Sequence, residues 1–314
     1  MRLFWTVLAA LTALVTRPPV CANFLRAWPR LQELTGHVNL ASLVNRKNLL
    51  ATGGFARVYL TPFRNKYVAF KLVSLATPRK LVEFEREVGF LRAAKGSRGV
   101  AALRGCIMGS VNGQRFGGLF IEYLPVTLEQ LAPQIPFVSL SYRFKLYARL
   151  AEDLAELHAR NILHNDYKPR NVIVGGSEVL LAKMIDLGGS CRRNEVCYGG
   201  TELYAAPEKI GRNMRVVGSE AVDVWAFLVS VIELEAGGMD YPHLSEACFK
   251  VMMTLACFDD FKAFMADLLD NTPDALFALL LDSLAFDPAD RPTMAQLHQE
   301  FLEMDAALSE VVNA

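Results

Sequence analysis

The sequence lacks any excess of charge of one sign. Among its 314 residues, lysine and arginine together number 33, as do aspartate and glutamate, so the formal net charge at pH 7 is zero. Such a balance gives no indication of nucleic acid as a partner, and partners have to be inferred from local sites. Low-complexity tracts are also missing, and 52% hydrophobic with 21% charged residues is the composition of a globular protein.

Apolar runs long enough to cross a membrane are not evident either. Residues 3–15 are almost wholly apolar, but this run of about 13 residues falls short of the roughly 20 that a membrane-spanning helix needs. Arg2 precedes the run, and the small residues Val20-Cys21-Ala22 follow it, which is typical of a secretory signal peptide cleaved after Ala22. We therefore expect a secreted protein with no stable membrane span after cleavage. The alternatives are a mitochondrial presequence, a membrane anchor, or an N-terminal helix packed on a cytoplasmic protein.

Cysteine is scarce, and glycosylation acceptors of the type Asn-x-Ser/Thr are absent. Cleavage of the signal peptide would leave Cys106, Cys191, Cys197, Cys248 and Cys257, an odd number with at least one unpaired thiol. Cys191 and Cys197 flank a short polar run that a disulfide would close in an oxidising compartment. Alternatively, most of these cysteines are small buried hydrophobic residues. The pairing stays open at this point.

One short loop holds the most chemically useful group of residues, His164-Asn165-Asp166-Tyr167-Lys168-Pro169-Arg170-Asn171. A helix-periodic apolar run at residues 146–158 precedes it and a β-branched run at 171–174 follows, so we expect a helix-to-strand connection. Asp166 can accept a proton from a hydroxyl, Lys168 can neutralise charge on a transferring phosphoryl group, and Asn171 can offer an oxygen to Mg²⁺. A histidine beside an aspartate in a turn is also a common structural pair, so the loop alone leaves the function open.

Later motifs add the context that this loop needs. Asp186-Leu187-Gly188 follows a second apolar run at residues 180–185, and Ala206-Pro207-Glu208 comes further on. Together the three motifs resemble the eukaryotic-type protein kinase family, with its catalytic loop, metal-binding D-x-G and A-P-E motifs. The resemblance runs from about residue 43 to 305. It implies an α+β, two-lobed fold with a small antiparallel β-sheet N-lobe carrying one main helix, and a larger, mainly α-helical C-lobe.

The resemblance also divides the chain. We expect a signal peptide at 1–22, an N-terminal extension at 23–42 and a protein kinase domain at 43–314. Within that domain, the N-lobe would span 43–122, the hinge 122–126 and the C-lobe 127–314.

By this resemblance the N-lobe contains an ATP site. Residues 51–58 match the glycine-rich phosphate loop, but only Gly53 stands at a family glycine position, and Gly54 is an extra glycine beside it. Ala51 and Ala56 replace the other two glycines, which predicts a stiffer and weaker clamp on ATP. The other positions expected to bind nucleotide are Leu50, Val58 and Ala69 in the roof, Ile121 at the back, and Glu122 and Leu124 at the hinge.

The resemblance implies four catalytic residues, Asp166, Lys168, Lys71 and Glu87, with Asn171 and Asp186 as Mg²⁺ ligands. Lys71, which we expect at the end of a strand, matches the lysine that reaches the α- and β-phosphates. A helix expected at 79–94 carries several acids. Glu87 is preferred over Glu83 as the partner of Lys71, because apolar residues accompany Glu87 on its face. The implied cofactors are ATP and Mg²⁺.

Two further positions concern the substrate and regulation. Thr201 and Lys168 match positions that mark Ser/Thr rather than Tyr kinases, so we expect a protein substrate with a Ser or Thr hydroxyl. Asn165 stands where the family usually has an arginine that binds a phosphorylated activation-segment residue, so activity should not need that phosphorylation. Asp223 matches the residue that anchors the catalytic loop, and Glu208 with Arg291 matches a structural ion pair.

Two other functions stay open. A kinase-like phosphotransferase acting on a glycan or small metabolite would also accommodate Asn165. A pseudokinase scaffold is suggested only by the missing loop glycines. The sequence predicts no oligomeric state.

Overall fold

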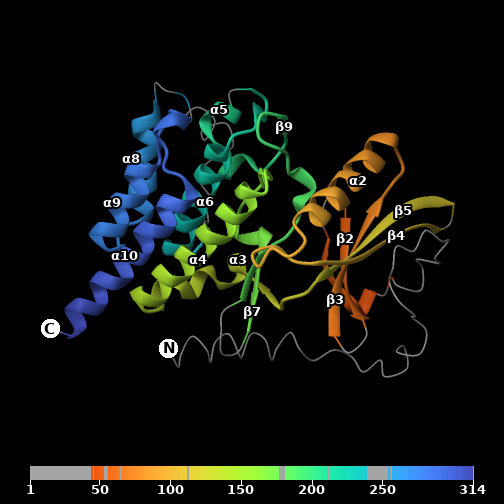
Figure 1. Cartoon of the computed structure of the whole chain (residues 1–314), viewed down its shortest axis with the longest axis horizontal. Coiled ribbons are helices and arrows are strands. Elements are labelled where there is room, and N and C mark those ends of the chain that lie inside the picture. Colours follow the sequence, from red (N-terminus) through yellow and green to blue (C-terminus); the bar gives the residue numbers. More distant parts are fainter. Residues whose placement is uncertain are drawn as a thin grey trace.

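The computed structural model describes residues 44, 46–52, 56–63, 66–111, 113–176, 181–210, 212–238, 254 and 257–313. These form the two predicted lobes, a small antiparallel sheet with one long helix and a larger, mainly helical part (Figure 1). The predicted signal peptide and N-terminal extension, Gly53 and Gly54 of the phosphate loop, and Cys248 lie outside the described residues. No helix in the described part of the chain is long and apolar enough to span a bilayer.

The N-lobe sheet has the strand order β1-β2-β3-β5-β4, and all neighbouring pairs are antiparallel. Its strands are β1 (Leu49–Thr52), β2 (Ala56–Phe63), β3 (Lys66–Ser74), β4 (Leu103–Val111) and β5 (Gln114–Glu122), preceded by the 3₁₀ turn η2 (Arg46–Asn48). Helix α2 (Pro78–Ala93) follows β3, and the side chain of Thr77 caps it by accepting the Lys80 amide hydrogen.

Alternation along β3 places its side chains on two faces of the sheet. Val68, Phe70 and Leu72 belong to a small cluster on one face, whereas Val73 packs with residues of α2 on the other. Lys71 shares the face of Val73 and therefore points toward α2. We expected Lys71 at the end of a strand. It lies instead within β3, because the strand continues through buried residues to Ser74.

The C-lobe begins after β5 and is built around a long buried helix, α6. Its elements are β6 (Val126–Thr127), α3 (Leu128–Leu131), α4 (Leu140–Ala159), β7 (Val172–Gly175), β8 (Leu181–Met184), β9 (Val196–Tyr198), α5 (Pro207–Ile210), β10 (Arg215–Val217), α6 (Glu220–Glu235), α8 (Phe258–Leu268), α9 (Asp274–Ser283) and α10 (Met294–Asn313). Short 3₁₀ turns are η3 (Ala132–Phe137), η4 (Pro169–Asn171), η5 (Leu187–Gly189), η6 (Glu202–Tyr204) and η8 (Pro288–Asp290).

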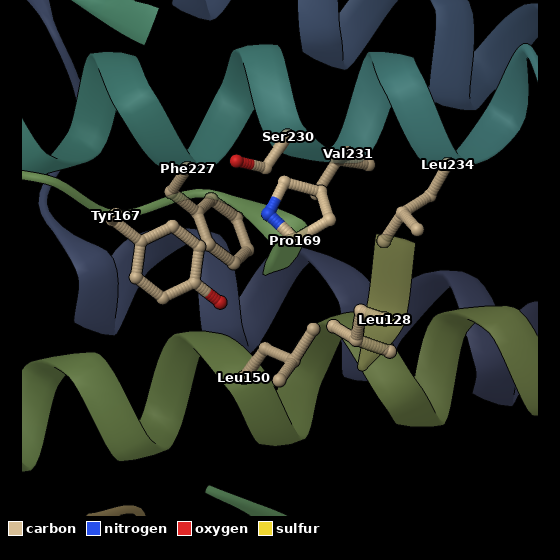
Figure 2. A pocket seen from close by; sticks show the side chains of 8 residues that line it. All are labelled: Leu128, Leu150, Tyr167, Pro169, Phe227, Ser230, Val231 and Leu234. Carbon is tan, nitrogen blue, oxygen red and sulfur yellow. The ribbon is translucent and has the colours of Figure 1, made fainter. Parts of the chain in front are cut away.

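The loop of residues 164–171 connects α4 to β7 by way of η4, which is the predicted helix-to-strand connection. Two of its side chains, Tyr167 and Pro169, lie between α4 and α6, against an apolar pocket (Figure 2). The pocket is lined by Leu128, Leu150, Tyr167, Pro169, Phe227, Ser230, Val231 and Leu234. Because interiors pack as densely as organic crystals, this apolar base holds the loop rigidly while its polar side chains face the other way.

Candidate active site

Lys71 joins the two lobes through a pair of carboxylates. Its Nζ lies 2.6 Å from Glu87 Oε1 on α2 and 2.7 Å from Asp186 Oδ1 in the D-x-G motif. Glu83 instead contacts Arg79 and Lys80 on the exposed side of α2. The structure thus brings Glu87, and not Glu83, to Lys71.

The charges of this cluster depend on one another. Burial by itself would lower the pKa of Lys71, but the carboxylates of Glu87 and Asp186 raise it above its ordinary value. Burial raises the pKa of Glu87, and Lys71 only partly offsets this. Partial burial acts on the half-exposed Asp186 in the same direction, but Lys71 outweighs it and holds the pKa of Asp186 below its usual range. Asp186 is therefore the carboxylate of the pair that stays ionised more readily.

The Asp166 carboxylate stands at the centre of a second cluster. Its Oδ2 accepts a hydrogen bond from Lys168 Nζ at 2.8 Å, and its Oδ1 accepts one from the Thr201 hydroxyl at 2.8 Å. Lys168 Nζ also donates to Thr201 Oγ1, which closes a triangle. The structure therefore already presents a side-chain hydroxyl to Asp166, held in place by Lys168.

Asn171 lies beside both clusters. Its Nδ2 donates to the Asp166 backbone oxygen at 2.8 Å and to Asp166 Oδ2 at 3.2 Å, which leaves its amide oxygen for a cation. Its backbone oxygen accepts the Ile185 amide hydrogen at 2.9 Å, so Asn171 and Asp186 are neighbours across the β7–β8 pair. An amide oxygen and a carboxylate fit the hard-ligand preference of Mg²⁺. No cluster of three or more His, Cys, Asp or Glu side chains suited to a metal occurs among the described residues.

Sheet pairing places three of the residues expected around an adenine ring near Lys71. Val58 lies opposite Lys71, and Ala69 lies opposite Ile121 in the next strand pair. Leu50 is exposed at the outer edge on β1, and Leu124 is half-buried after β5. Apolar residues on neighbouring strands thus lead from Lys71 toward the expected hinge, and their binding of adenine stays a prediction.

Glu122 contributes differently from its neighbours. Its Oε2 accepts the Ala102 amide hydrogen at 3.1 Å and lies 3.2 Å from Lys183 Nζ and 3.6 Å from Arg104. These contacts hold the side chain away from the hinge edge. If Glu122 binds nucleotide, it does so through its backbone.

Two buried groups fix the C-lobe beneath these clusters. Asp223 at the start of α6 accepts the backbone amide hydrogens of His164 and Asn165, each at 2.7 Å. Arg291 makes two hydrogen bonds of 2.8 Å to the Glu208 carboxylate, and its guanidinium lies 5.0 Å from the Trp225 ring centroid. Both arrangements are those expected from the sequence.

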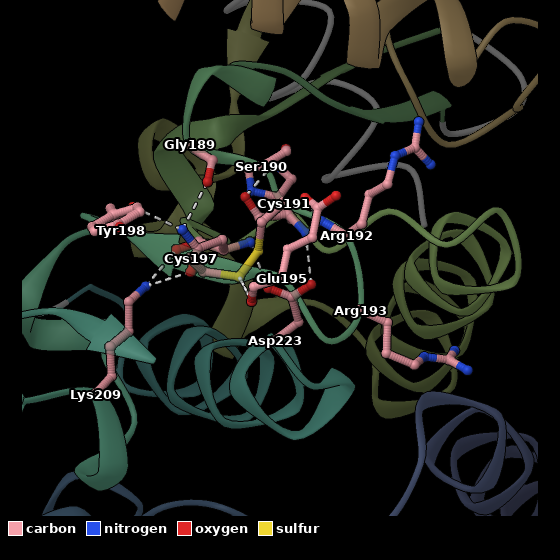
Figure 3. The surroundings of a disulfide bond; sticks show 12 residues. Gly189, Ser190, Cys191, Arg192, Arg193, Glu195, Cys197, Tyr198, Lys209 and Asp223 are labelled. Atoms are coloured by element: carbon pink, nitrogen blue, oxygen red, sulfur yellow. Dashed lines mark hydrogen bonds between the residues drawn. A yellow bond between two sulfur atoms is a disulfide. The ribbon is translucent and has the colours of Figure 1, made fainter. Parts of the chain in front are cut away.

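The activation segment, residues 186–208, contains a disulfide between Cys191 and Cys197, with their Cα atoms 5.6 Å apart (Figure 3). The backbone of Cys191 pairs with Leu163 just before the catalytic loop, through hydrogen bonds of 2.8 and 3.1 Å. This is the pairing that the sequence left open. Cys106 and Cys257 are the free thiols among the described residues.

Sequence reasoning did not identify Lys209, a lysine that directly follows the Ala-Pro-Glu motif. It is 1% exposed, and its Nζ donates to the backbone oxygen and Oδ1 of Asn165 at 2.9 and 2.7 Å. A lysine on a short helix is ordinarily solvated, so its position in the sequence carries no signal of burial. The only hint was the missing arginine at position 165.

Comparison with known families matches the protein kinase domain to residues 44–302. Among curated proteins, tyrosine-protein kinase SRK2 of Spongilla lacustris is 29% identical over 189 residues, which are 57% of this chain and 49% of the relative. The probable serine/threonine-protein kinase mkcD of Dictyostelium discoideum is 28% identical over 263 residues, 79% of this chain and 38% of the relative. Tyrosine-protein kinase ABL2 of Homo sapiens is 26% identical over 287 residues, 86% of this chain and 22% of the relative.

The matched region spans about half or less of the length of these relatives, which include both tyrosine and serine/threonine kinases. The family match covers well over half of the chain, and the two-lobed fold with its clusters at Lys71 and Asp166 agrees with it. The chain therefore belongs to the protein kinase family.

Proposed function

We propose that this chain is an ATP-dependent serine/threonine protein kinase of the secretory pathway, active without phosphorylation of its activation segment. The observation that carries the Ser/Thr specificity is the triangle of Asp166, Lys168 and Thr201, in which an aliphatic hydroxyl lies 2.8 Å from the carboxylate. A substrate serine or threonine is another aliphatic hydroxyl and suits the same short reach.

The residues divide the phosphoryl transfer among them. Asp166 orients the substrate hydroxyl and accepts its proton, while Lys168 neutralises charge on the transferring group. Lys71, held by Glu87, positions the nucleotide phosphates. When bound to Asn171 and Asp186, Mg²⁺ would supply further neutralisation of phosphate charge. Because most of this catalysis is positioning and electrostatics, it depends on clusters that the protein holds before substrate binds.

The test is phosphate incorporation from labelled ATP with Mg²⁺ into three peptides that differ only in a central Ser, Thr or Tyr. We expect incorporation into the Ser and Thr peptides, and loss of it in Asp166→Asn. Asp305→Asn, a change on α10 far from the clusters, is the matched control and should retain activity. Preference for the Tyr peptide would contradict the specificity. If only the sugars of a parallel panel are labelled, the result would favour a glycan or metabolite kinase. If the protein binds nucleotide but transfers no phosphate to any acceptor, the result would favour a pseudokinase.

Secretion is supported by the Cys191–Cys197 disulfide, because such bonds persist mainly in oxidising compartments. Expression of the full chain in cultured eukaryotic cells tests it. We expect the protein in the medium with Asn23 as its first residue, and we expect Leu8→Arg, which interrupts the apolar run, to prevent export. A wild-type protein that stays in the cytosol with residues 1–22 attached would contradict secretion.

A further inference from the structure

We infer that Lys209 is a positioning residue that, through Asn165, fastens the activation segment to the catalytic loop. This buried contact would take the place of the bond between an arginine and a phosphorylated residue. The inference rests on the proposed function, since it assigns a regulatory feature to the same active site. Three independent observations support it.

The first observation is the geometry of the lysine itself. Lys209 lies on α5, and its side chain extends toward the disulfide loop (Figure 3). Its Nζ donates to two oxygens of Asn165 in the catalytic loop. An ammonium group has three donors and no acceptor. The oxygen end of the Asn165 amide must therefore face Lys209, and its nitrogen end must face the opposite way.

The second observation is what that nitrogen contacts. Asn165 Nδ2 donates to the backbone oxygen of Gly189 at 2.7 Å and to that of Tyr198 at 3.0 Å. These two residues lie on either side of the Cys191–Cys197 loop. One amide, oriented by Lys209, thus holds both ends of the disulfide loop against the catalytic loop. Asn165 itself adopts φ of 65°, a left-handed conformation that asparagine tolerates better than most residues.

The third observation is the space left for the lysine. Gly200 has φ of +106°, and a Cβ built on it would lie 2.7 Å from Lys209 Nζ and 2.8 Å from the Asn165 backbone oxygen. Gly199 also has a positive φ, of +73°, but a Cβ there would meet nothing within 4 Å. Gly200 therefore leaves room for the ammonium group beside the activation segment.

The surroundings make this contact sensitive to charge. The carboxylates near Lys209 are Asp166 of the catalytic loop, Asp223 of α6 and Glu208 of α5. Each already has other partners: Lys168 for Asp166, His158 for Asp223, and Arg291 for Glu208. Burial lowers the pKa of Lys209 to about 8 despite these three acids. The charged form therefore predominates below about pH 8 and is lost above it, and with it the stronger, charge-assisted hydrogen bonds.

The main test compares Lys209→Met, which keeps the length of the side chain but removes its charge and donors, with Arg143→Met. Arg143 is a buried cation that pairs with Glu235 between α4 and α6, so its loss destabilises the fold without touching the segment. We expect Lys209→Met to lower kcat/KM for the peptide by about tenfold or more, the size of one lost charge-assisted hydrogen bond, while the KM for ATP stays within about twofold. A change that only destabilises the fold should not lower kcat/KM for the peptide while leaving the KM for ATP unchanged.

Trypsin supplies a readout that needs no kinase activity. Arg192 and Arg193 lie exposed between the two cysteines, so cleavage there leaves two pieces joined by the disulfide until reduction. We expect Lys209→Met to be cut at these arginines several times faster than wild type, and Arg143→Met at the wild-type rate. Unchanged cleavage in Lys209→Met would overturn the inference even if the chain phosphorylates peptides. Faster cleavage in a chain without kinase activity would instead refute the proposed function alone.

Two further measurements keep the inference testable should Lys209→Met fail to fold. Gly200→Ala should behave like Lys209→Met in both assays. Gly199→Ala has the same kind of backbone strain but no clash, so it should change the peptide kcat/KM and the cleavage rate much less.

Wild-type peptide kcat/KM should fall as pH rises through about 8, the pKa of Lys209. That fall should be absent in Lys209→Met. Equal effects of the two glycine variants, or the same pH profile in both proteins, would contradict the inference.

Discussion

The Lys71 ammonium holds together two carboxylates that would otherwise repel each other. Glu87 and Asp186 come from different lobes, and both contact Lys71 Nζ at less than 3 Å. They do different things because their surroundings differ. Glu87 is buried and serves to orient Lys71, whereas the Asp186 side chain is 46% exposed and remains open to a cation.

We predict that Asp186→Asn abolishes phosphoryl transfer while the fold stays intact. The change removes a charge from the proposed metal site but almost no volume, and Lys71 keeps Glu87 as its partner. The loss should be at least about 3 kcal/mol of transition-state stabilisation, or more than about a hundredfold in rate. Single-turnover kinetics with a melting curve would measure both effects, and turnover near that of wild type would contradict the role of this residue.

At the scale of elements, the strands that flank the phosphate loop differ from the family pattern. Ala51 and Ala56, on the strands that flank the phosphate loop, replace glycines, and neither has a positive φ. Alanine therefore fits these backbone positions without strain, and its methyl group is the whole difference.

Replacing both alanines, Ala51→Gly with Ala56→Gly, should lower the KM for ATP and leave kcat nearly unchanged. Removing two methyls over the phosphates would improve binding of the nucleotide in the ground state and the transition state alike. Steady-state kinetics at varied ATP concentration would show it, with Ala159→Gly at the end of α4 as the control. Identical constants in all three proteins would mean that the loop closes equally well with alanine.

The second element is the disulfide loop of the activation segment. Reduction would remove the covalent closure of this loop and leave only hydrogen bonds to hold it, among them those from Asn165 to Gly189 and Tyr198. We predict that peptide phosphorylation falls on treatment with dithiothreitol and is unaffected by phosphatase. The physical reason is that order here comes from a covalent link and a buried lysine instead of a phosphate group.

The control for this prediction is a pair of variants. Cys191→Ala with Cys197→Ala should have the reduced protein's activity and no further response to dithiothreitol. Cys106→Ser with Cys257→Ser, which removes the described free thiols, should respond as wild type does. A large fall in activity after phosphatase treatment would contradict activity independent of phosphorylation.

At the scale of the whole molecule, the buried acids of α6 make stability depend on pH. Burial raises the pKa of Glu233 to about 7, although Tyr204 donates a hydrogen bond to it at 2.7 Å. The ordinary pKa of a glutamate is 4.5, so between pH 4.5 and about 7 the Glu233 carboxyl is ionised in the unfolded chain but still protonated in the folded one. The folded state therefore loses stability as pH rises through that interval, and the loss is complete above it.

Glu233→Gln should remove this penalty, because a neutral amide can still accept the Tyr204 hydrogen bond. We predict a stability gain on the order of 1–3 kcal/mol at pH 8 and almost none at pH 4.5 or below. Urea unfolding at both pH values would measure it. A gain of equal size at both would show that charge is not the cause.

Motifs in the sequence, through their resemblance to the protein kinase family, predicted the fold class and the residues of the candidate site. Helix and strand periodicity predicted the helix-to-strand connection that lies between α4 and β7, and the resemblance to the kinase motifs singled out Asp166, Asn171 and Asp186. The helical repeat also indicated Glu87, because the residues within a few turns of a helix show which of its faces is buried. These features depend on near neighbours in the chain, which a sequence displays directly.

Only the tertiary structure decided which distant groups meet. The link between Cys191 and Cys197, the side-chain contacts of Glu122, and the burial of Lys209 against Asn165 all depend on how the two lobes and the activation segment fold over one another. A lysine after Ala-Pro-Glu has the same local sequence whether it is solvated or buried. Its lowered pKa comes from burial, and the side chain to which it donates belongs to an asparagine 44 residues away, because burial and hydrogen bonding are properties of the packed chain.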